Sequence, residues 1–212
     1  MKIAVLAASF VFALPLFAQE RVEKATLLKP RAPFTESGAI SNTEIGSELH
    51  KIEDGILNGV AYRVYYTDGS GTFSGSPDGK LGGALGRQSE WSTACKKDAI
   101  NDKKSCHLQR EDLWVWLSQG GRVDVFIGGE HYPGTSATIR VDSKPAIKTP
   151  SNNEGFFTTA QSKQIVQQLI SGNTVVTRYI DWPYRAEKDE SFDLSGFDEA
   201  YAYIQWAIKQ IR

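Results

Sequence analysis

The chain has 212 residues, which at about 150 residues per domain corresponds to one domain with extensions. Hydrophobic residues make up 41% of the chain and charged residues 23%, so the composition excludes a wholly disordered protein. The formal net charge is −1, from 24 Lys and Arg against 25 Asp and Glu, which excludes a broad basic surface and argues against nucleic acid as a partner.

The first 18 residues have the pattern of a secretory signal peptide. Lys2 precedes an apolar run over 3–17, and the small residue Ala18 closes it before the chain turns polar. The run is short for a membrane span, and no later apolar run approaches the necessary length. We predict cleavage after Ala18, export to the periplasm or the exterior, no transmembrane segment and no lipid anchor. An N-terminal core helix is the alternative.

Residues 19–58 show no sustained periodicity and contain two prolines. We predict an extended N-terminal arm here, with a short helix near 45–52. The remainder, 59–212, is predicted to be a single β-rich domain. Its first strand, 60–66, is rich in β-branched and aromatic residues. The glycine-rich stretch 68–86 that follows is predicted to be a flexible loop.

Cys95 and Cys106 are the two cysteines of the sequence. Export places them in an oxidising compartment, and the polar stretch between them contains Asn101-Asp102, a pair that favours a turn. We predict a disulfide, which contributes about 3 kcal/mol, mostly by restricting the unfolded chain. Two free buried thiols are the alternative. A metal site is not predicted, because the spacing differs from that of zinc ligands.

The segment 88–142 predicts a run of antiparallel strands. Strands at 122–127 and 136–142 alternate apolar and polar residues, and we expect them to form a hairpin around the loop 128–134. The strand at 112–118 is apolar on both faces, which indicates the middle of a packed sheet or sandwich. Its two faces carry Leu113, Val115 and Leu117 on one side and Trp114 and Trp116 on the other.

Two helices are predicted after these strands. The first begins at a cap on Thr158 or Thr159 and ends near Ser171, and a further strand follows at 174–181. The second is amphipathic and begins at Ser195, whose hydroxyl is the expected N-cap. The fold class is therefore mainly β with two helices (α+β): an antiparallel β-sandwich-like domain with one helix after the central strands and one at the C-terminus.

Searching for catalytic motifs returns no complete set, and we predict no cofactor and no metal. His131 lies between two predicted strands and is the candidate general base, with Asp142 or Asp124 as the carboxylate that orients it. An envelope hydrolase built on these residues is the alternative function. A turn histidine without a catalytic role is the simpler interpretation.

Aromatic side chains give the clearest binding signal. Trp182 and Tyr184 follow a predicted strand end, where a ring is often exposed and can stack on a sugar or anchor a partner. We expect Trp114 or Trp116, together with Trp206, to fill the core instead.

Arg140 and Asp142 place two opposite charges on one face of a predicted strand. Paired across strands with Asp124 and Arg122, they would form a charge ladder worth under about 1 kcal/mol per pair. A recognition patch is the alternative, so Arg140 and Asp142 join Trp182 and Tyr184 as the candidate binding surface.

Short motifs follow one another along 88–207. They are Trp91-Ser92-Thr93-Ala94-Cys95, Cys106, the strand end Ile139-Arg140-Val141-Asp142, the helix end Leu169-Ile170-Ser171-Gly172 and the closing Leu194-Ser195-Gly196-Phe197. This arrangement resembles the invasion-associated locus B-like exported proteins of Gram-negative bacteria. The resemblance implies a periplasmic β-sandwich-like domain with no established catalytic residues, and for some members an association with host-cell invasion. The second cysteine pair that several relatives carry in 151–159 is absent here.

Together these patterns predict an exported periplasmic module of the cell envelope that binds or assists a partner without catalysing a reaction. The partner is another envelope protein or a cell-wall component, and virulence or invasion is the associated process. Contacts are expected at the loops 68–86 and 128–134 and at the corner 182–184. The alternatives are the hydrolase and an adhesin that is released from the cell.

Overall fold

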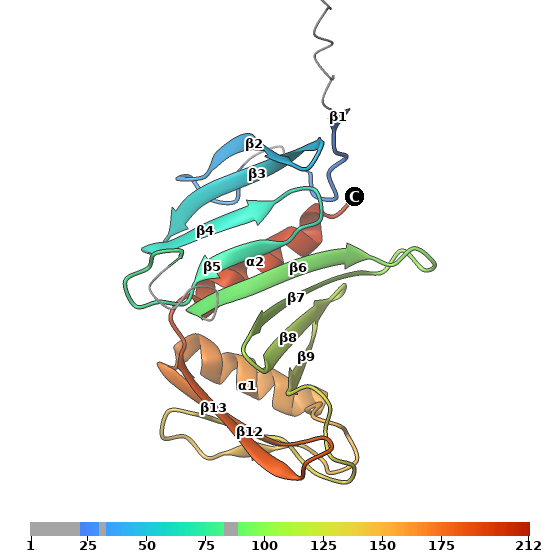
Figure 1. Ribbon diagram of the computed structural model, residues 1–212, viewed down its shortest axis with the longest axis vertical. Coiled ribbons are helices and arrows are strands. Elements are labelled where there is room, and N and C mark those ends of the chain that lie inside the picture. The colour runs from blue at the N-terminus through green and yellow to red at the C-terminus, as the bar shows by residue number, and fades with distance from the viewer. Residues whose placement is uncertain (1–21, 30–32, 83–88) are drawn as a thin grey trace, which may run out of the picture.

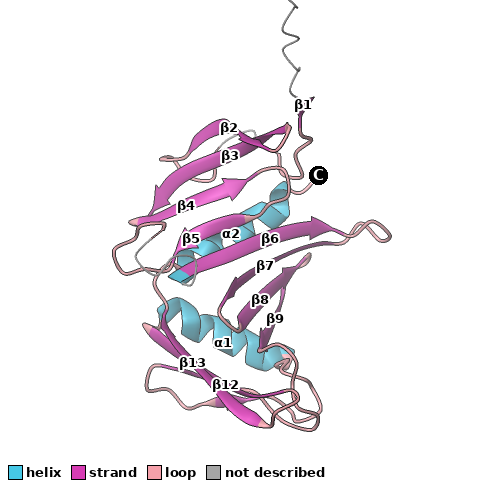
Figure 2. Ribbon diagram, in the orientation of Figure 1, coloured by secondary structure: helices cyan, strands magenta, loops and turns pink. Residues whose placement is uncertain are grey.

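The computed structural model describes residues 22–29, 33–82 and 89–212, which form two sheets and two helices (Figures 1 and 2). Most strand pairs are antiparallel, and a short parallel contact joins the first and third strands. In chain order the elements are β1 (Val22–Glu23), β2 (Ala39–Ile45), β3 (Glu48–Leu57), β4 (Val60–Tyr65), β5 (Gly71–Ser74), β6 (Glu90–Lys97), β7 (Lys104–Arg110), β8 (Leu113–Ser118), β9 (Arg122–Ile127), β10 (Thr138–Val141), β11 (Ile147–Lys148), α1 (Thr159–Ser171), β12 (Thr174–Asp181), β13 (Ala186–Asp193) and α2 (Phe197–Gln210).

The large sheet has the order β1-β3-β4-β5-β6-β7-β8-β9, with β2 on the other side of β3. Helix α2 crosses behind it in Figure 1 and covers one of its faces. Trp91 on β6 is fully buried there, and its indole Nε1 donates to the carbonyl of Ser195 at 2.8 Å. Phe73 on β5 and Tyr203 on α2 pack with their ring centroids 5.4 Å apart. The core therefore lies between the large sheet and the C-terminal helix.

The small sheet has the order β11-β10-β12-β13, and α1 lies between it and β9 (Figure 1). Buried residues of α1 such as Ile165 and Leu169 face the same core as Val141 and Val175 of the small sheet. The helix begins as predicted, because the Thr158 hydroxyl accepts from the Gln161 amide in a capping box. The predicted fold class, mainly β with two helices and antiparallel sheets in a sandwich-like arrangement, is confirmed.

The predicted extended arm is wrong for residues 39–57, which form β2 and β3. The short helix predicted near 45–52 is wrong for the same reason. Ile45 pairs with Glu48 across a two-residue turn in which Gly46 has φ 62°, so the chain reverses there. Local periodicity is weak in β2, and its strand conformation depends on pairing with β3.

The glycine-rich segment is also more ordered than predicted, because residues 71–74 form β5 between β4 and β6. Its glycines permit close packing: a Cβ on Gly71 would lie 2.8 Å from the side chains of Val64 and Thr93. Residues 83–86 of the predicted loop lie outside the described residues, as does the predicted signal peptide.

Two predictions about the C-terminal part need correction. Strand β13 was not expected, because its residues are charged and mostly exposed and show no alternation. Its hydrogen bonds to β12 define it instead. Helix α2 begins after Gly196, which has φ 78° and provides no side-chain cap, so Ser195 is not the N-cap. The Ser195 amide instead donates to Asp193 Oδ1 at 2.6 Å, because the chain turns sharply between β13 and α2.

The predicted hairpin of 122–127 with 136–142 does not form. Strand β9 ends the large sheet, whereas β10 pairs with β11 and β12 in the small sheet. Alternation along each strand identified its buried face correctly but carried no information about its partner. The predicted disulfide is confirmed: Cys95 and Cys106 face each other across β6 and β7 and are bonded.

A buried carboxylate holds the start of the large sheet together. Glu53 on β3 has no exposed surface, and its carboxylate accepts hydrogen bonds from the hydroxyls of Tyr62 and Tyr66, each at 2.5 Å. The backbone amide of Phe34 donates to both carboxylate oxygens, at 2.9 and 2.8 Å. Because ionised acceptors form strong hydrogen bonds, this cluster fastens the segment before β2 onto β3 and β4.

We predict that Glu53→Ala lowers the free energy of unfolding by about 3 kcal/mol or more, because two buried hydroxyls and one amide lose their acceptor. The adjacent Asp54 is the matched control, since its exposed carboxylate pairs with Arg63 on the opposite face. Asp54→Ala should cost about 1 kcal/mol or less. Urea unfolding of the two variants measures the difference, and equal losses would contradict this account of Glu53.

Candidate functional site: an aromatic groove

The face of the large sheet opposite α2 carries three transverse rows of side chains on β6–β9. They follow from the register, which aligns every second residue of these four strands. The first row is Lys96, Ser105, Ser118 and Arg122; the second is Ala94, His107, Trp116 and Asp124; the third is Ser92, Gln109, Trp114 and Phe126. These positions are partly or fully exposed, whereas the residues between them are buried.

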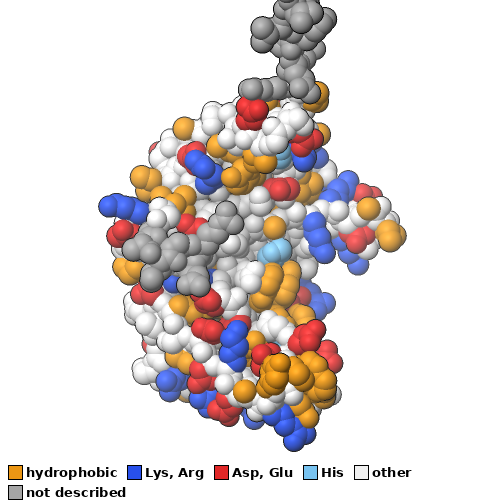
Figure 3. All heavy atoms as spheres, viewed as in Figure 1, with side chains coloured by type: hydrophobic (Ala, Val, Ile, Leu, Met, Phe, Trp, Pro, Cys, Tyr) orange, Lys and Arg blue, Asp and Glu red, His pale blue; other side chains and the backbone are white. Residues whose placement is uncertain are grey.

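Aromatic rings occupy the middle of this face, where Figure 3 shows hydrophobic side chains over β7 and β8. Trp114 and Trp116 are stacked, with centroids 5.3 Å apart and an interplanar angle of 9°. Phe156 lies 6.0 Å from Trp116 and 4.7 Å from Phe126. Since Trp114 covers one face of Trp116, the opposite face of that indole is directed along the strand towards the first row.

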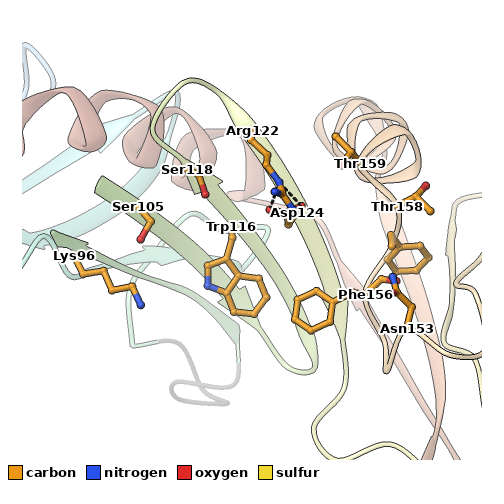
Figure 4. A pocket seen from close by; sticks show the side chains of 11 residues that line it. Lys96, Ser105, Trp116, Ser118, Arg122, Asp124, Asn153, Phe156, Thr158 and Thr159 are labelled. Carbon is orange, nitrogen blue, oxygen red and sulfur yellow. Dashed lines mark hydrogen bonds and ion pairs between the residues drawn. The ribbon is translucent and has the colours of Figure 1, made fainter. Parts of the chain in front are cut away.

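Residues 153–159, which lead into α1, form the second wall of a groove beside these strands (Figure 4). We call it the aromatic groove. Its volume is about 670 Å³, within the usual range for small-molecule sites. It is lined by Lys96, Ser105, Trp116, Ser118, Arg122, Asp124, Asn153, Phe156, Phe157, Thr158 and Thr159.

Polar groups of the groove are largely available to a ligand. The hydroxyls of Ser105, Ser118 and Thr159 form no hydrogen bond with the described residues, and Lys96 forms no ion pair with them. Arg122 is engaged, since its guanidinium pairs with Asp124 at 3.0 Å on the same strand. The groove therefore offers one uncompensated cation beside an aromatic surface with hydroxyls.

His107 lies among these residues on β7, with its ring 5.4 Å from that of Trp114 and 6.1 Å from that of Trp116. Burial and the positive charge of Lys96 both lower the pKa of His107 from its ordinary value. The imidazole is therefore neutral at pH 7 and contributes an apolar, polarisable surface next to the indoles.

The predicted catalytic residues are not brought together. The His131 segment bridges to Asp181 at one end of β12, whereas the Asp142 amide donates to the carbonyl of Thr174 at the other end. An eight-residue strand separates these ends by about 23 Å. Asp142 is occupied as an acceptor for the backbone amides of 173 and 174, which lower its pKa. Asp124 is occupied by Arg122.

The His131 ring has a packing environment. It contacts the rings of Phe126 and Tyr179, at 5.7 and 4.9 Å, and its Nε2 lies 2.6 Å from the carbonyl of Ile127. No hydrogen bond or ion pair joins it to a carboxylate among the described residues. These contacts extend the aromatic surface of the groove, since Phe126 is also in contact with Phe156.

The predicted binding surface is divided between two places. Trp182 and Tyr184 are exposed, at 46% and 80%, and Trp182 packs on Tyr132 with ring centroids 5.4 Å apart. Arg185 lies over the same Tyr132 ring at 4.4 Å. Arg140 projects from β10, where it is exposed, and Asp142 lies beyond the other end of the small sheet. The expected ladder with Arg122 and Asp124 is absent because β9 and β10 belong to different sheets.

Sequence reasoning missed the groove because it assigned one of its tryptophans to the core. Trp91 is the fully buried tryptophan of the described residues, while Trp114 and Trp116 are both partly exposed on the open face. Their shared face was correctly predicted from alternation. The polar neighbours Lys96, Ser105 and Ser118 carry no local signal and join the site only through strand register.

Comparison of the chain with protein-family models, curated proteins and solved structures finds no match. Neither helix in the described part of the chain is long and apolar enough to cross a membrane. Across residues 22–29, 33–82 and 89–212, no group of three or more His, Cys, Asp or Glu side chains is arranged to hold a metal ion.

We predict that His107 makes the fold less stable at mildly acidic pH. Because its pKa is lower in the folded chain, the unfolded chain takes up the proton first, and the free energy of unfolding falls as pH decreases through about 6.5. The loss ends once pH falls below the pKa of the folded state. Urea unfolding at pH 8.0 and at about pH 5 should show a smaller decrease for His107→Gln than for the natural chain. An identical decrease in both proteins would contradict the assignment.

Proposed function

We propose that the protein is an exported, non-catalytic binding module of the Gram-negative cell envelope, and that its aromatic groove holds the partner. The observation that carries the proposal is the open face of β6–β9, where Trp116 and Phe156 flank hydroxyls and a cation without protein partners. Aromatic rings surrounded by polar groups are the usual composition of a recognition surface. The partner is an envelope protein or a cell-wall component.

Export is supported by the pattern of the first 18 residues and by the disulfide, which is compatible with a periplasmic or extracellular protein. The resemblance of 88–207 to the invasion-associated locus B-like proteins agrees with this location. An association with virulence or invasion follows from that resemblance alone. An envelope hydrolase centred on His131 has less support, since neither Asp142 nor Asp124 is available to orient the ring.

We expect the full chain, expressed in a Gram-negative host, to be recovered from the periplasm or medium with Gln19 as its first residue. Its intact mass should be lower by two hydrogen atoms than that of the reduced protein, because Cys95 and Cys106 are joined. Fractionation followed by mass spectrometry measures both properties. Recovery in the cytoplasm with Met1 retained would contradict export.

Binding is tested by the share of tagged protein that sediments with washed cell envelopes. We expect Trp116→Ala with Phe156→Ala to lower that share at least about fivefold, because the double variant removes both aromatic walls of the groove. Trp182→Ala is the matched control, since this exposed tryptophan lies outside the groove. Loss of sedimentation in the control alone would transfer the binding site to the corner formed by Trp182 and Tyr184.

A further inference from the structure

The aromatic groove presents one flat apolar surface bordered by a row of small polar groups. The face of Trp116 not covered by Trp114 is directed towards Ser105 and Ser118, and Phe156 lies across from it with 42% of its surface exposed (Figure 4). A flat ring with apolar C–H groups on its faces and polar groups at its edge fits such a surface. Pyranose sugars have this distribution of groups.

Hydroxyl chemistry of the groove matches that of a sugar. Ser105, Ser118 and Thr159 each carry a hydroxyl that both donates and accepts, and none of these forms a hydrogen bond with the described residues. Sugar hydroxyls also donate and accept, so each pair can satisfy both roles. From Lys96 on β6 to Arg122 on β9 the first row spans three strand spacings, about 14 Å, which is enough for a short oligosaccharide.

Charge in the groove selects for an acidic ligand. Lys96 extends towards Trp116 in Figure 4 and has no ion-pair partner among the described residues, whereas Arg122 is neutralised by Asp124. The N-terminus of α1 borders the opposite wall, and its first turn contains no acidic residue. Both features favour a negative charge on whatever binds between them.

An extended peptide has less to bind to here, because the outer edge of β9 is already paired. The Phe157 amide donates to the carbonyl of Val125 at 3.0 Å, and the Ile127 amide donates to the carbonyl of Gly155 at 3.2 Å. The Val125 amide donates to the Ser162 hydroxyl at 3.0 Å. A peptide strand added to this edge would have to displace these bonds, so the groove offers side chains and no free backbone edge.

We propose that the aromatic groove binds an acidic oligosaccharide, with a sugar ring on Trp116, its hydroxyls on Ser105 and Ser118, and its carboxylate on Lys96. This inference rests on the proposed function and specifies the class of partner. Glycan strands of the bacterial cell wall freed of their peptides have this chemistry, since every second sugar carries a free carboxylate. Chitin oligosaccharides have the same type of backbone without the carboxylates.

Isothermal titration of the purified, disulfide-bonded protein with peptide-free cell-wall glycan strands tests the proposal, with chitin oligosaccharides of equal length as the neutral probe. We expect the acidic glycan to bind more tightly than chitin. Trp116→Ala should weaken binding of both probes at least about tenfold. Lys96→Gln should weaken only the acidic probe, by about fivefold, and should abolish most of its salt dependence.

Matched controls separate the groove from the rest of the surface. Lys163→Gln changes an exposed lysine on α1 outside the groove lining, and Trp182→Ala an exposed tryptophan; both should bind like the natural chain. Should Trp116→Ala fail to fold, as judged by its urea unfolding curve, Phe156→Ala and Lys96→Gln carry the test, since both side chains are exposed.

Three results would overturn the inference. They are no binding of either glycan, equal binding of the acidic and neutral probes, and tighter binding of a hexaglutamate peptide than of the glycan. If glycans do not bind but sedimentation with envelopes still requires Trp116 and Phe156, the groove holds an envelope protein, and the proposed function stands without the glycan. If sedimentation is also independent of the groove, both proposals fail.

Discussion

Helix α2 covers one face of the large sheet, and the rest of the structure depends on this one-sided cover. Its buried residues, among them Tyr203 and Ile204, pack against the inward residues of β5–β7. Because side chains alternate along a strand, the intervening residues must project from the opposite face. A shift of one residue would exchange the two faces, and the Cys95–Cys106 bond joins directly opposed residues, so it keeps β6 and β7 in register.

The second wall of the groove requires the small sheet and α1 to be held against β9. Buried polar contacts do this at two points. Thr177 on β12 donates to Asp112, between β7 and β8, at 2.7 Å, and burial raises the pKa of this carboxyl. Arg110 donates to the carbonyls of Gly75 and Asp193, at 3.0 and 2.8 Å, with its guanidinium over the Trp91 ring. These bonds connect segments far apart in the chain, so the groove is a product of long-range contacts.

Exposed aromatic side chains on a sheet face are unfavourable unless neighbouring groups shield them or a ligand covers them. Here the rings shield one another: Trp114 stacks on Trp116, and Phe126 contacts both Phe156 and His131. The remaining open surface is the face of Trp116 and part of Phe156, next to Lys96. Shielding and recognition therefore use the same set of side chains, which explains why a partly buried histidine and two indoles occupy adjacent positions on neighbouring strands.

Local sequence patterns determined the strands at 113–118, 122–127 and 174–181, the Thr158 cap of α1 and the cysteine pair, because alternation, capping and spacing act over a few residues. They placed Trp114 and Trp116 on one face and Arg122 and Asp124 on one face. The tertiary structure alone decided that β10 leaves β9 for another sheet, that 39–57 form a hairpin, and that Lys96, Ser105 and Ser118 align beside Trp116. A strand's period specifies which residues share a face. Which face a helix covers, and which strands become neighbours, depend on the summed burial and hydrogen bonding of residues distant in the chain.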